Sequence, residues 1–175
     1  GLWQVLSVLV LAVLPGRVGA AGGLREHSIE PEDYFSIGVI TDCALSADGA
    51  LVAYTENRWE PPAEERNLDL WVVDRRTGTR RRLTFERGSD ASPVWSPDTR
   101  SLAFTSYMRG YPYLYRMFPF ENRQAQVLAG FLGINTSPAF SPDGRWVALT
   151  LSRDGNPEVY VLNLASGAFR RLTTY

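Results

Sequence analysis

Residues able to do chemistry are few in this chain. His27 is the single histidine and Cys43 the single cysteine among 175 residues. One cysteine excludes an internal disulfide, and one histidine excludes a histidine-rich metal site. A Ser-His-Asp triad would have to use His27, which lies between Glu26 and Ser28, where a solvated or capping role is expected. We therefore predict no catalytic, cofactor-binding or metal-binding residue in these 175 residues, and no cofactor.

Sequence motifs of common active sites are also missing. The chain contains no Gly-x-Ser-x-Gly nucleophile elbow and none of the spacings of a phosphate-binding loop, a dinucleotide-binding fingerprint or an EF-hand. Asp48, Asp98 and Asp143 occupy equivalent positions in tight turns, and we interpret them as turn residues rather than as a metal cluster. Any hydrolase nucleophile would then have to come from residues outside this sequence.

Charge and composition exclude further classes. The formal net charge of −1, with 18 basic residues that are all Arg, argues against a dedicated nucleic-acid binder. A hydrophobic content of 45% argues against intrinsic disorder. Five Arg residues lie within residues 75–82, which we interpret as a solvated hairpin, the alternative being a patch for an acidic partner or a lipid headgroup. Cys43 lies in an apolar stretch and is expected to be a small core residue.

The elements that must position these residues repeat along the chain. Three segments align, with their serines 50 and 45 residues apart: Ala44–Gly49, Val94–Thr99 and Ala139–Gly144. Two further sets of equivalent positions keep nearly the same spacing: Leu70, Leu114 and Val159, and then Leu83, Leu128 and Leu172. Regular spacing at three independent positions indicates a structural repeat of a size typical of a propeller blade.

Each repeat has the pattern of four short antiparallel strands. The Ser-Pro-Asp-Gly segment at 141–144 is typical of a tight turn, because Pro fixes one φ angle and Gly accepts a positive one. Two-residue alternation of apolar residues on either side indicates strands. We predict an all-β fold, a β-propeller fragment of about three four-stranded antiparallel blades of a larger ring. A β-sandwich would not repeat its sequence at a fixed period.

The predicted division of the chain follows from this repeat. It comprises a truncated signal peptide (1–20), a leader with a short helix (21–40), blade 1 (41–88), blade 2 (89–133) and blade 3 (134–175). Blade 1 has six extra residues around Trp59–Arg66, which we expect to form a polar surface loop, and such insertions can contact a partner. Three blades do not close a ring, so the remaining blades are expected beyond Tyr175.

The first 20 residues indicate export. The apolar run Leu2–Leu14 is shorter than the roughly 20 residues that a membrane span needs, and Val18-Gly19-Ala20 suits signal peptidase. A buried strand or a membrane anchor is the alternative. Export predicts a periplasmic or secreted protein. In the leader, Pro31-Glu32-Asp33 is expected to open a short helical turn, with Pro at its first position, that could pack onto the ring.

The second half of the chain contains the motifs Ser137–Gly144 and Asp154-Gly155-Asn156-Pro157-Glu158. By these motifs roughly residues 104–175 resemble the propellers of TolB, a component of the Tol–Pal system of the periplasm. TolB carries a separate α/β domain before its propeller, whereas only 23 residues separate Ala20 from Ala44 here. The resemblance implies a non-catalytic propeller that recognises partner proteins.

The first half resembles a different family. Pro31–Phe35, Ala44–Gly49 and Val52–Thr55 are similar to the opening of propellers in the prolyl oligopeptidase and dipeptidyl-peptidase IV family. There the resemblance implies a propeller followed by an α/β-hydrolase domain. The glutamate pair that grips a substrate amino terminus in some dipeptidyl peptidases has no match, because Glu64-Glu65 lacks the flanking aromatic pattern.

Two functions from different classes follow. The first is an exported, non-catalytic, TolB-like propeller acting as a protein-interaction module in the cell envelope, with a protein or peptide partner, no nucleic acid, and membrane association only through envelope partners. The second is the gating propeller of an exported serine peptidase of the prolyl oligopeptidase family, with its catalytic domain beyond residue 175. A propeller with a ligand of its own is the third possibility.

Overall fold

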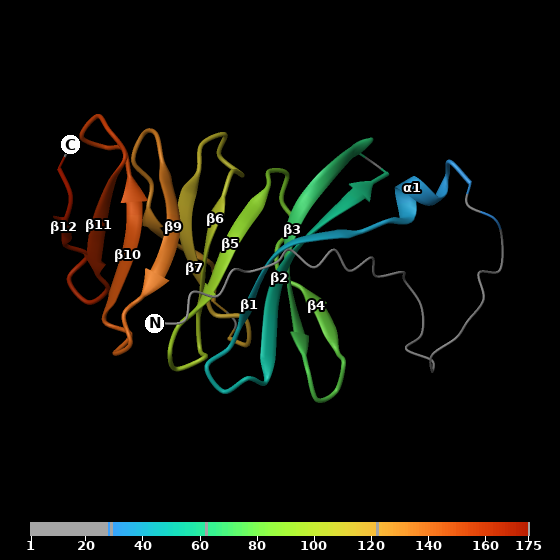
Figure 1. Cartoon of the computed structure of the whole chain (residues 1–175), viewed down its shortest axis with the longest axis horizontal. Helices are drawn as coiled ribbons and strands as arrows, with labels where there is room; N and C mark the ends of the chain where they lie inside the picture. Colours follow the sequence, from blue (N-terminus) through green and yellow to red (C-terminus); the bar gives the residue numbers. More distant parts are fainter. Residues whose placement is uncertain (1–27, 29, 62, 122, 175) are drawn as a thin grey trace, which may run out of the picture.

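The computed structural model describes residues 28, 30–61, 63–121 and 123–174. Their strands form three four-stranded antiparallel sheets, which we call blades 1, 2 and 3 (Figure 1). The predicted architecture is confirmed at this level. The signal peptide predicted at residues 1–20 lies outside the described residues. No helix among the described residues is long and apolar enough to span a bilayer.

The strands follow one another in order within each blade. Blade 1 contains β1 (Val39–Leu45), β2 (Leu51–Glu60), β3 (Glu65–Asp74) and β4 (Arg80–Arg82). Blade 2 contains β5 (Asp90–Trp95), β6 (Leu102–Ser106), β7 (Tyr113–Met117) and β8 (Gln126–Ala129). Blade 3 contains β9 (Asn135–Phe140), β10 (Trp146–Leu151), β11 (Glu158–Asn163) and β12 (Phe169–Arg171).

The turn between the first two strands is built in the same way in each blade. In blade 2, Ser96 Oγ donates to Asp98 Oδ1 over 2.5 Å and accepts from Ser101 N, while Asp98 Oδ1 also accepts from Arg100 N. The same bonds recur between Ser46 and Asp48 and between Ser141 and Asp143. The repeated serine and aspartate are therefore turn-forming residues. The hydrogen bonds that Asp98 accepts from Ser96 Oγ and Arg100 N lower its pKa.

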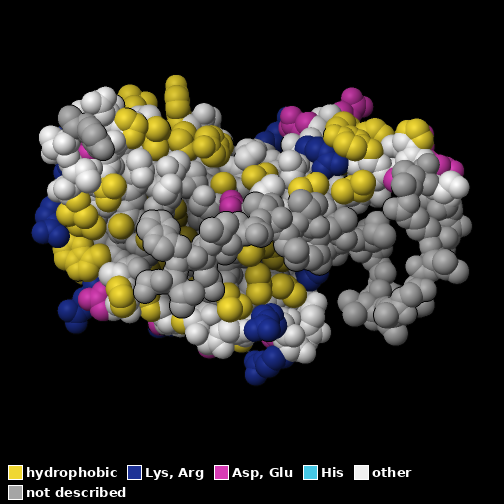
Figure 2. Space-filling view, in the orientation of Figure 1, with side chains coloured by type: hydrophobic (Ala, Val, Ile, Leu, Met, Phe, Trp, Pro, Cys, Tyr) yellow, Lys and Arg dark blue, Asp and Glu magenta, His cyan; other side chains and the backbone are white. Residues whose placement is uncertain are grey.

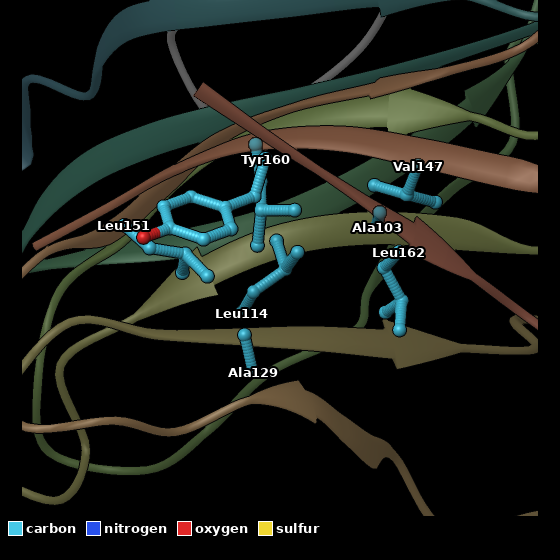
Figure 3. Close-up of a cluster of buried hydrophobic side chains, with 8 residues drawn as sticks. Ala103, Leu114, Ala129, Val147, Leu151, Tyr160 and Leu162 are labelled. Atoms are coloured by element: carbon cyan, nitrogen blue, oxygen red, sulfur yellow. The ribbon is translucent and has the colours of Figure 1, made fainter. Parts of the chain in front are cut away.

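The blades stack side by side, and two apolar cores lie between them. Phe104 and Tyr115 of blade 2 pack against Leu70 and Val72 of blade 1. Alternate residues of blade 2 point the other way, so that Leu114 packs against blade 3. Figure 3 shows this second core, whose buried members are Ala103, Leu114, Ala129, Val147, Leu149, Leu151, Tyr160 and Leu162. Because successive residues of a strand face opposite sides, each blade contributes to the core on either side of it.

Two faces of the stack carry the connections. The upper face in Figure 1 carries the hairpin turns β2–β3, β6–β7 and β10–β11, together with the β4–β5 and β8–β9 connections. The lower face carries the remaining turns. The first strand of each blade (β1, β5, β9) has a register irregularity in its pairing with the next strand. Ser92 and Ser137 adopt positive φ angles of 54° and 57° at two of these irregularities.

The leader contains a short helix, α1 (Asp33–Ser36). Glu32, rather than Pro31, precedes it directly, because the first turn closes with a hydrogen bond from Asp33 N to Glu30 O and one from Glu30 N to Asp33 Oδ2. The helical residues therefore begin two residues later than proline at the first position would require. The chain then runs from α1 straight into β1.

Candidate functional site

The six extra residues of blade 1 lengthen two strands instead of forming a loop. β2 and β3 remain paired to their ends, with Trp59 opposite Arg66 and Glu60 opposite Glu65. The expectation of a surface loop around Trp59–Arg66 was therefore wrong, because β2 continues to Glu60 and β3 begins at Glu65. We call the lengthened ends of β2 and β3 the extension. It projects from the upper face as a β-hairpin (Figure 1).

Arg66 fastens the leader to this hairpin. Its guanidinium donates to Tyr34 O (2.9 Å), Tyr34 Oη (3.2 Å) and Ile37 O (3.2 Å), and lies 4.5 Å from the centre of the Tyr34 ring. Phe35 packs edge-on against Trp59, with ring centres 4.9 Å apart. One arginine thus holds the backbone of α1 and the start of β1 against the extension, so the leader packs on blade 1.

A buried ion pair joins β3 to β4 at the base of the extension. Asp69 Oδ2 lies 2.7 Å from Arg82 Nη2, and Asp69 is 1% exposed. Arg82 also donates to Thr84 O, and Thr84 Oγ1 accepts from Leu70 N. Burial raises the pKa of Asp69 to about 6, because Arg82 compensates the loss of solvation only in part.

Blade 3 contains the same arrangement. Glu158 Oε1 lies 2.6 Å from Arg171 Nη2, Arg171 donates to Thr173 O, and Thr173 Oγ1 accepts from Val159 N. Blade 2 has Tyr113, Val127 and Ala129 in the corresponding positions. Sequence reasoning found these positions as recurring apolar motifs but missed the acid–Arg–Thr cluster between them. In both blades the arginine follows the acid by 13 residues and the threonine follows it by 15, and this recurring spacing was the signal available in the sequence.

Within the run of arginines at 75–82, successive side chains of β4 point to opposite sides of the sheet. Arg80 bonds Glu56 (2.8 Å) and Tyr54 Oη (2.7 Å) on the same side as the Arg82 ion pairs. Arg81 points the other way and lies 5.2 Å from the centre of the Phe120 ring. Arg80 and Arg82 are therefore occupied by acidic partners within blade 1, which argues against a continuous patch for an acidic ligand.

Apolar side chains gather on the upper face, where three connections lie side by side. Tyr107 N donates to Ser89 O, which joins the β6–β7 turn to the β4–β5 connection, and Asn135 Nδ2 donates to Pro112 O, which joins it to blade 3. We call the exposed large apolar residues of these connections the upper patch. Its members are Phe85, Tyr107, Met108, Tyr111, Leu132 and Ile134.

The upper patch is exposed to an extent that is unusual for such large side chains. Phe85 is 69% exposed, Tyr111 55% and Leu132 78%. Figure 2 shows hydrophobic side chains along the upper edge of the molecule, above blades 2 and 3. A group of exposed aromatic and aliphatic side chains on rigid connections is typical of a protein-binding surface.

A shallow pocket of about 180 Å³ lies next to this patch, between the extension and the β4–β5 connection. Its lining residues are Glu60, Ala63, Glu65, Asn67, Arg82, Phe85 and Arg87. Arg82 is engaged by Glu60 (2.9 Å) as well as by Asp69. The pocket therefore offers an exposed ring and mixed charge, a composition that suits a polypeptide better than a polyanion.

The remaining expectations concern single residues. His27 lies outside the described residues. Cys43 is exposed, so its interpretation as a core residue was wrong. It pairs with Tyr54 across β1 and β2, on the face of blade 1 that points away from blade 2, where the described residues contain no further sheet. Asp48, Asp98 and Asp143 stand in three separate turns.

Comparison with known proteins points to two groups of propellers. No family model matches the chain. Over 110 residues, 63% of this chain and 26% of the relative, it is 34% identical to the Tol-Pal system protein TolB of Ruthia magnifica subsp. Calyptogena magnifica. Over 82 residues, 47% of this chain and 12% of the relative, it is 29% identical to the uncharacterized peptidase YuxL of Bacillus subtilis. The chain thus spans about a quarter or less of these relatives.

Solved structures give the same two groups. TolB from Acinetobacter baumannii superposes with a TM-score of 0.63 and 25% identity, over 81% of this chain and 38% of that one. Acylaminoacyl peptidase from Pyrococcus horikoshii superposes with a TM-score of 0.63 over 80% of this chain and 26% of that one, at 12% identity, which supports the fold alone. The described blades are therefore similar to those of TolB and of peptidase propellers.

Proposed function

We propose that this chain is part of an exported, non-catalytic, TolB-like propeller, and that it binds a protein partner of the cell envelope through its upper face. The observation that carries the proposal is the upper patch, with Phe85, Tyr111 and Leu132 more than half exposed on connections that hydrogen bonds hold together. Large apolar side chains on a rigid face are what a protein partner buries. The similarity to TolB sequences supports an envelope location.

The partner is expected to be a polypeptide with both apolar and charged side chains. Glu65 and Arg87 line the pocket beside the patch, and neither is in an ion pair with another described residue. The two side chains offer one charge of each sign at the rim of an apolar surface. This arrangement matches the usual anatomy of a protein interface, an apolar centre with a polar rim.

Calorimetric titration tests the proposal. The full-length protein is titrated with the Pal protein of the same organism, because the TolB relative is a Tol–Pal component. Tyr111→Ala is expected to weaken binding at least tenfold, as for a central aromatic residue of an interface. Phe120→Ala is the matched control, since Phe120 is 58% exposed on the lower face. Equal affinities of the two variants would contradict the upper-face assignment.

The second candidate is the gating propeller of an exported serine peptidase. The match of 82 residues to the Bacillus peptidase favours it. The coding sequence after residue 175 separates the two candidates. A Gly-x-Ser-x-Gly motif followed by Asp and His would support the peptidase, and a stop codon after two or three further blades would support the interaction module. Labelling of the full-length protein with a fluorophosphonate probe gives the same answer in the laboratory.

A further inference from the structure

A second pocket opens on the lower face, between the β3–β4 turn of blade 1 and the β7–β8 connection of blade 2 (Figure 1). It has a volume of about 290 Å³, close to the lower end of the range of small-molecule sites. The upper patch lies on the opposite face, so the proposed function makes no use of this pocket.

The floor and one wall of the pocket are apolar. Leu51 of β2 and Val72 of β3 form the floor, and Val72 is 4% exposed because it belongs to the core that blades 1 and 2 share. Phe120 of blade 2 forms the wall and is 58% exposed. It follows Pro119, which is buried and restricts the backbone at this point. An aliphatic group in the pocket would therefore bury apolar surface against both blades.

Two opposite charges stand beside this floor. Asp74 lies two residues beyond Val72 on β3, and Arg81 lies opposite Val72 on β4, so both are on the same side of the sheet. No ion pair joins them among the described residues. The Arg81 guanidinium instead lies 5.2 Å from the centre of the Phe120 ring and makes no hydrogen bond within the described ranges. An arginine stacked on a ring keeps its N–H groups available for a carboxylate.

The Asp74 carboxylate uses only one of its oxygens within the protein. Oδ1 accepts from two backbone N–H groups of the β3–β4 turn, over 2.8 and 3.2 Å, whereas Oδ2 makes no hydrogen bond in the part of the chain that the structure describes. Asn163 has the corresponding position in blade 3, and its Oδ1 accepts from two backbone N–H groups of its own turn over 3.0 Å. A neutral amide is therefore sufficient to form the turn, and the negative charge of Asp74 is available to a ligand.

The junction between blades 2 and 3 does not repeat this site. Arg116 and Phe118 occupy the positions of Val72 and Asp74, 44 residues further along the chain. Arg116 Nε donates to Ser101 Oγ over 2.8 Å, and its guanidinium lies 4.8 Å from the centre of the Phe118 ring. At this junction a side chain of the protein thus replaces the apolar floor, and an aromatic ring replaces the acid.

We propose that the pocket on the lower face binds a free α-amino acid with an aliphatic side chain. The ammonium group of the ligand pairs with Asp74 Oδ2, its carboxylate pairs with the guanidinium of Arg81, and its side chain lies on Leu51 and Val72 against the ring of Phe120. A simple anion would have Asp74 as a repelling neighbour, and a simple cation would have Arg81. A ligand with one charge of each sign beside an apolar group matches all of these residues, and its binding does not depend on the proposed function.

Ligand-detected NMR titrations of the full-length protein at pH 7 test this proposal with three probes. The probes are L-leucine, L-leucinamide, which lacks the carboxylate, and 4-methylpentanoate, which lacks the ammonium group. The wild type is expected to bind L-leucine about tenfold more tightly than either of the other two, because each of them lacks one charged hydrogen-bonding partner.

Two variants remove the charges one at a time. Asp74→Asn keeps the turn, as Asn163 shows in blade 3, and should bind L-leucine about tenfold more weakly than the wild type while losing the preference over 4-methylpentanoate. Arg81→Gln introduces the residue that blade 2 has at this position, Gln126, and should lose the preference over L-leucinamide. Arg170→Gln changes the corresponding arginine of blade 3 and is the matched control, which should bind all three probes as the wild type does.

The probes applied to the wild type decide even if a variant does not fold, which circular dichroism would show. No binding of L-leucine, equal affinity for the three probes, or tighter binding of 4-methylpentanoate than of L-leucine would overturn the proposal. Unchanged preferences in folded Asp74→Asn and Arg81→Gln would also overturn it.

Discussion

Asp69 and Arg82 face each other across β3 and β4 at 2.7 Å, and Glu158 and Arg171 do the same in blade 3 at 2.6 Å. In both places the arginine also bonds the carbonyl of a threonine whose hydroxyl accepts a backbone N–H of the third strand. The fourth strand of each of these blades, β4 and β12, is only three residues long. It therefore makes few backbone hydrogen bonds to the third strand. The ion pair and the threonine hold it in place.

Loss of Arg82 should destabilise the protein. In Arg82→Ala the carboxyl of Asp69 remains buried without its counter-charge. We expect the free energy of unfolding to fall by about 3 kcal/mol, the lower end of the range for buried pairs, because the arginine side chain is 22% exposed. Urea denaturation of the full-length protein measures this. Arg81→Ala is the control, since Arg81 lies on the opposite side of β4. A loss of equal size in both variants would contradict the structural role of the pair.

Gly88 should tolerate no side chain. It has a φ of +118°, and a Cβ atom there would lie 2.7 Å from backbone atoms of Met108. Gly88→Ala is expected to cost about 2–3 kcal/mol, because the backbone of the β6–β7 turn would have to move. Gly155→Ala has a similar φ of +110° but nothing within 4 Å of its Cβ position, and should cost only about 1 kcal/mol. Thermal unfolding distinguishes the two, and an equal effect would refute the close approach.

The leader should detach when Arg66 is removed. Arg66→Ala deletes the hydrogen bonds to Tyr34 and Ile37, and we expect cleavage by chymotrypsin after Tyr34 or Phe35 to become at least tenfold faster. Arg75→Ala is the control, because the Arg75 side chain donates to Gly49 O at a lower-face turn, away from the leader. Unchanged cleavage in Arg66→Ala would mean that the Phe35–Trp59 contact suffices to hold the leader.

The turn serines give a prediction for acidic pH. Ser96 donates to Asp98 and lowers its pKa, so this bond stabilises the fold above the ordinary aspartate pKa of 3.8 and the gain is lost as pH falls below it. Ser96→Ala should therefore cost about 1–2 kcal/mol at pH 7 and less at pH 3. Guanidinium titrations at the two pH values measure the difference. A cost that grows toward acidic pH would contradict the assigned bond.

The sequence predicts the blades because their turns are specified locally. Ser96-Pro97-Asp98-Thr99 and its equivalents form their own hydrogen bonds, and the strands beside them alternate regularly. The extension of blade 1 was misread because alternate positions of β2, on the side of Tyr54, are charged (Glu56, Arg58 and Glu60), and a proline pair follows. A pattern search for apolar residues does not detect a strand in which charged residues, paired with other charges, alternate along one side.

The polar junctions between blades were less predictable. Asp90 and Asn135 are separated by one repeat, yet their burial results from the connections that cover them, which no local pattern reveals. The upper patch has the same origin, since Phe85, Tyr111 and Leu132 belong to three connections that only the stacking of blades brings together. Cys43 was misassigned because an apolar stretch does not say which side of a strand faces a neighbouring sheet.

The most direct test of the upper face as a binding surface is hydrogen exchange of the full-length protein with and without saturating Pal. We predict slower exchange in residues 84–89, 107–112 and 130–134, which carry the upper patch, and no change in the lower-face turns at 75–79 and 118–121. Protection confined to the lower face, or no protection anywhere in the three blades at saturation, would contradict the account.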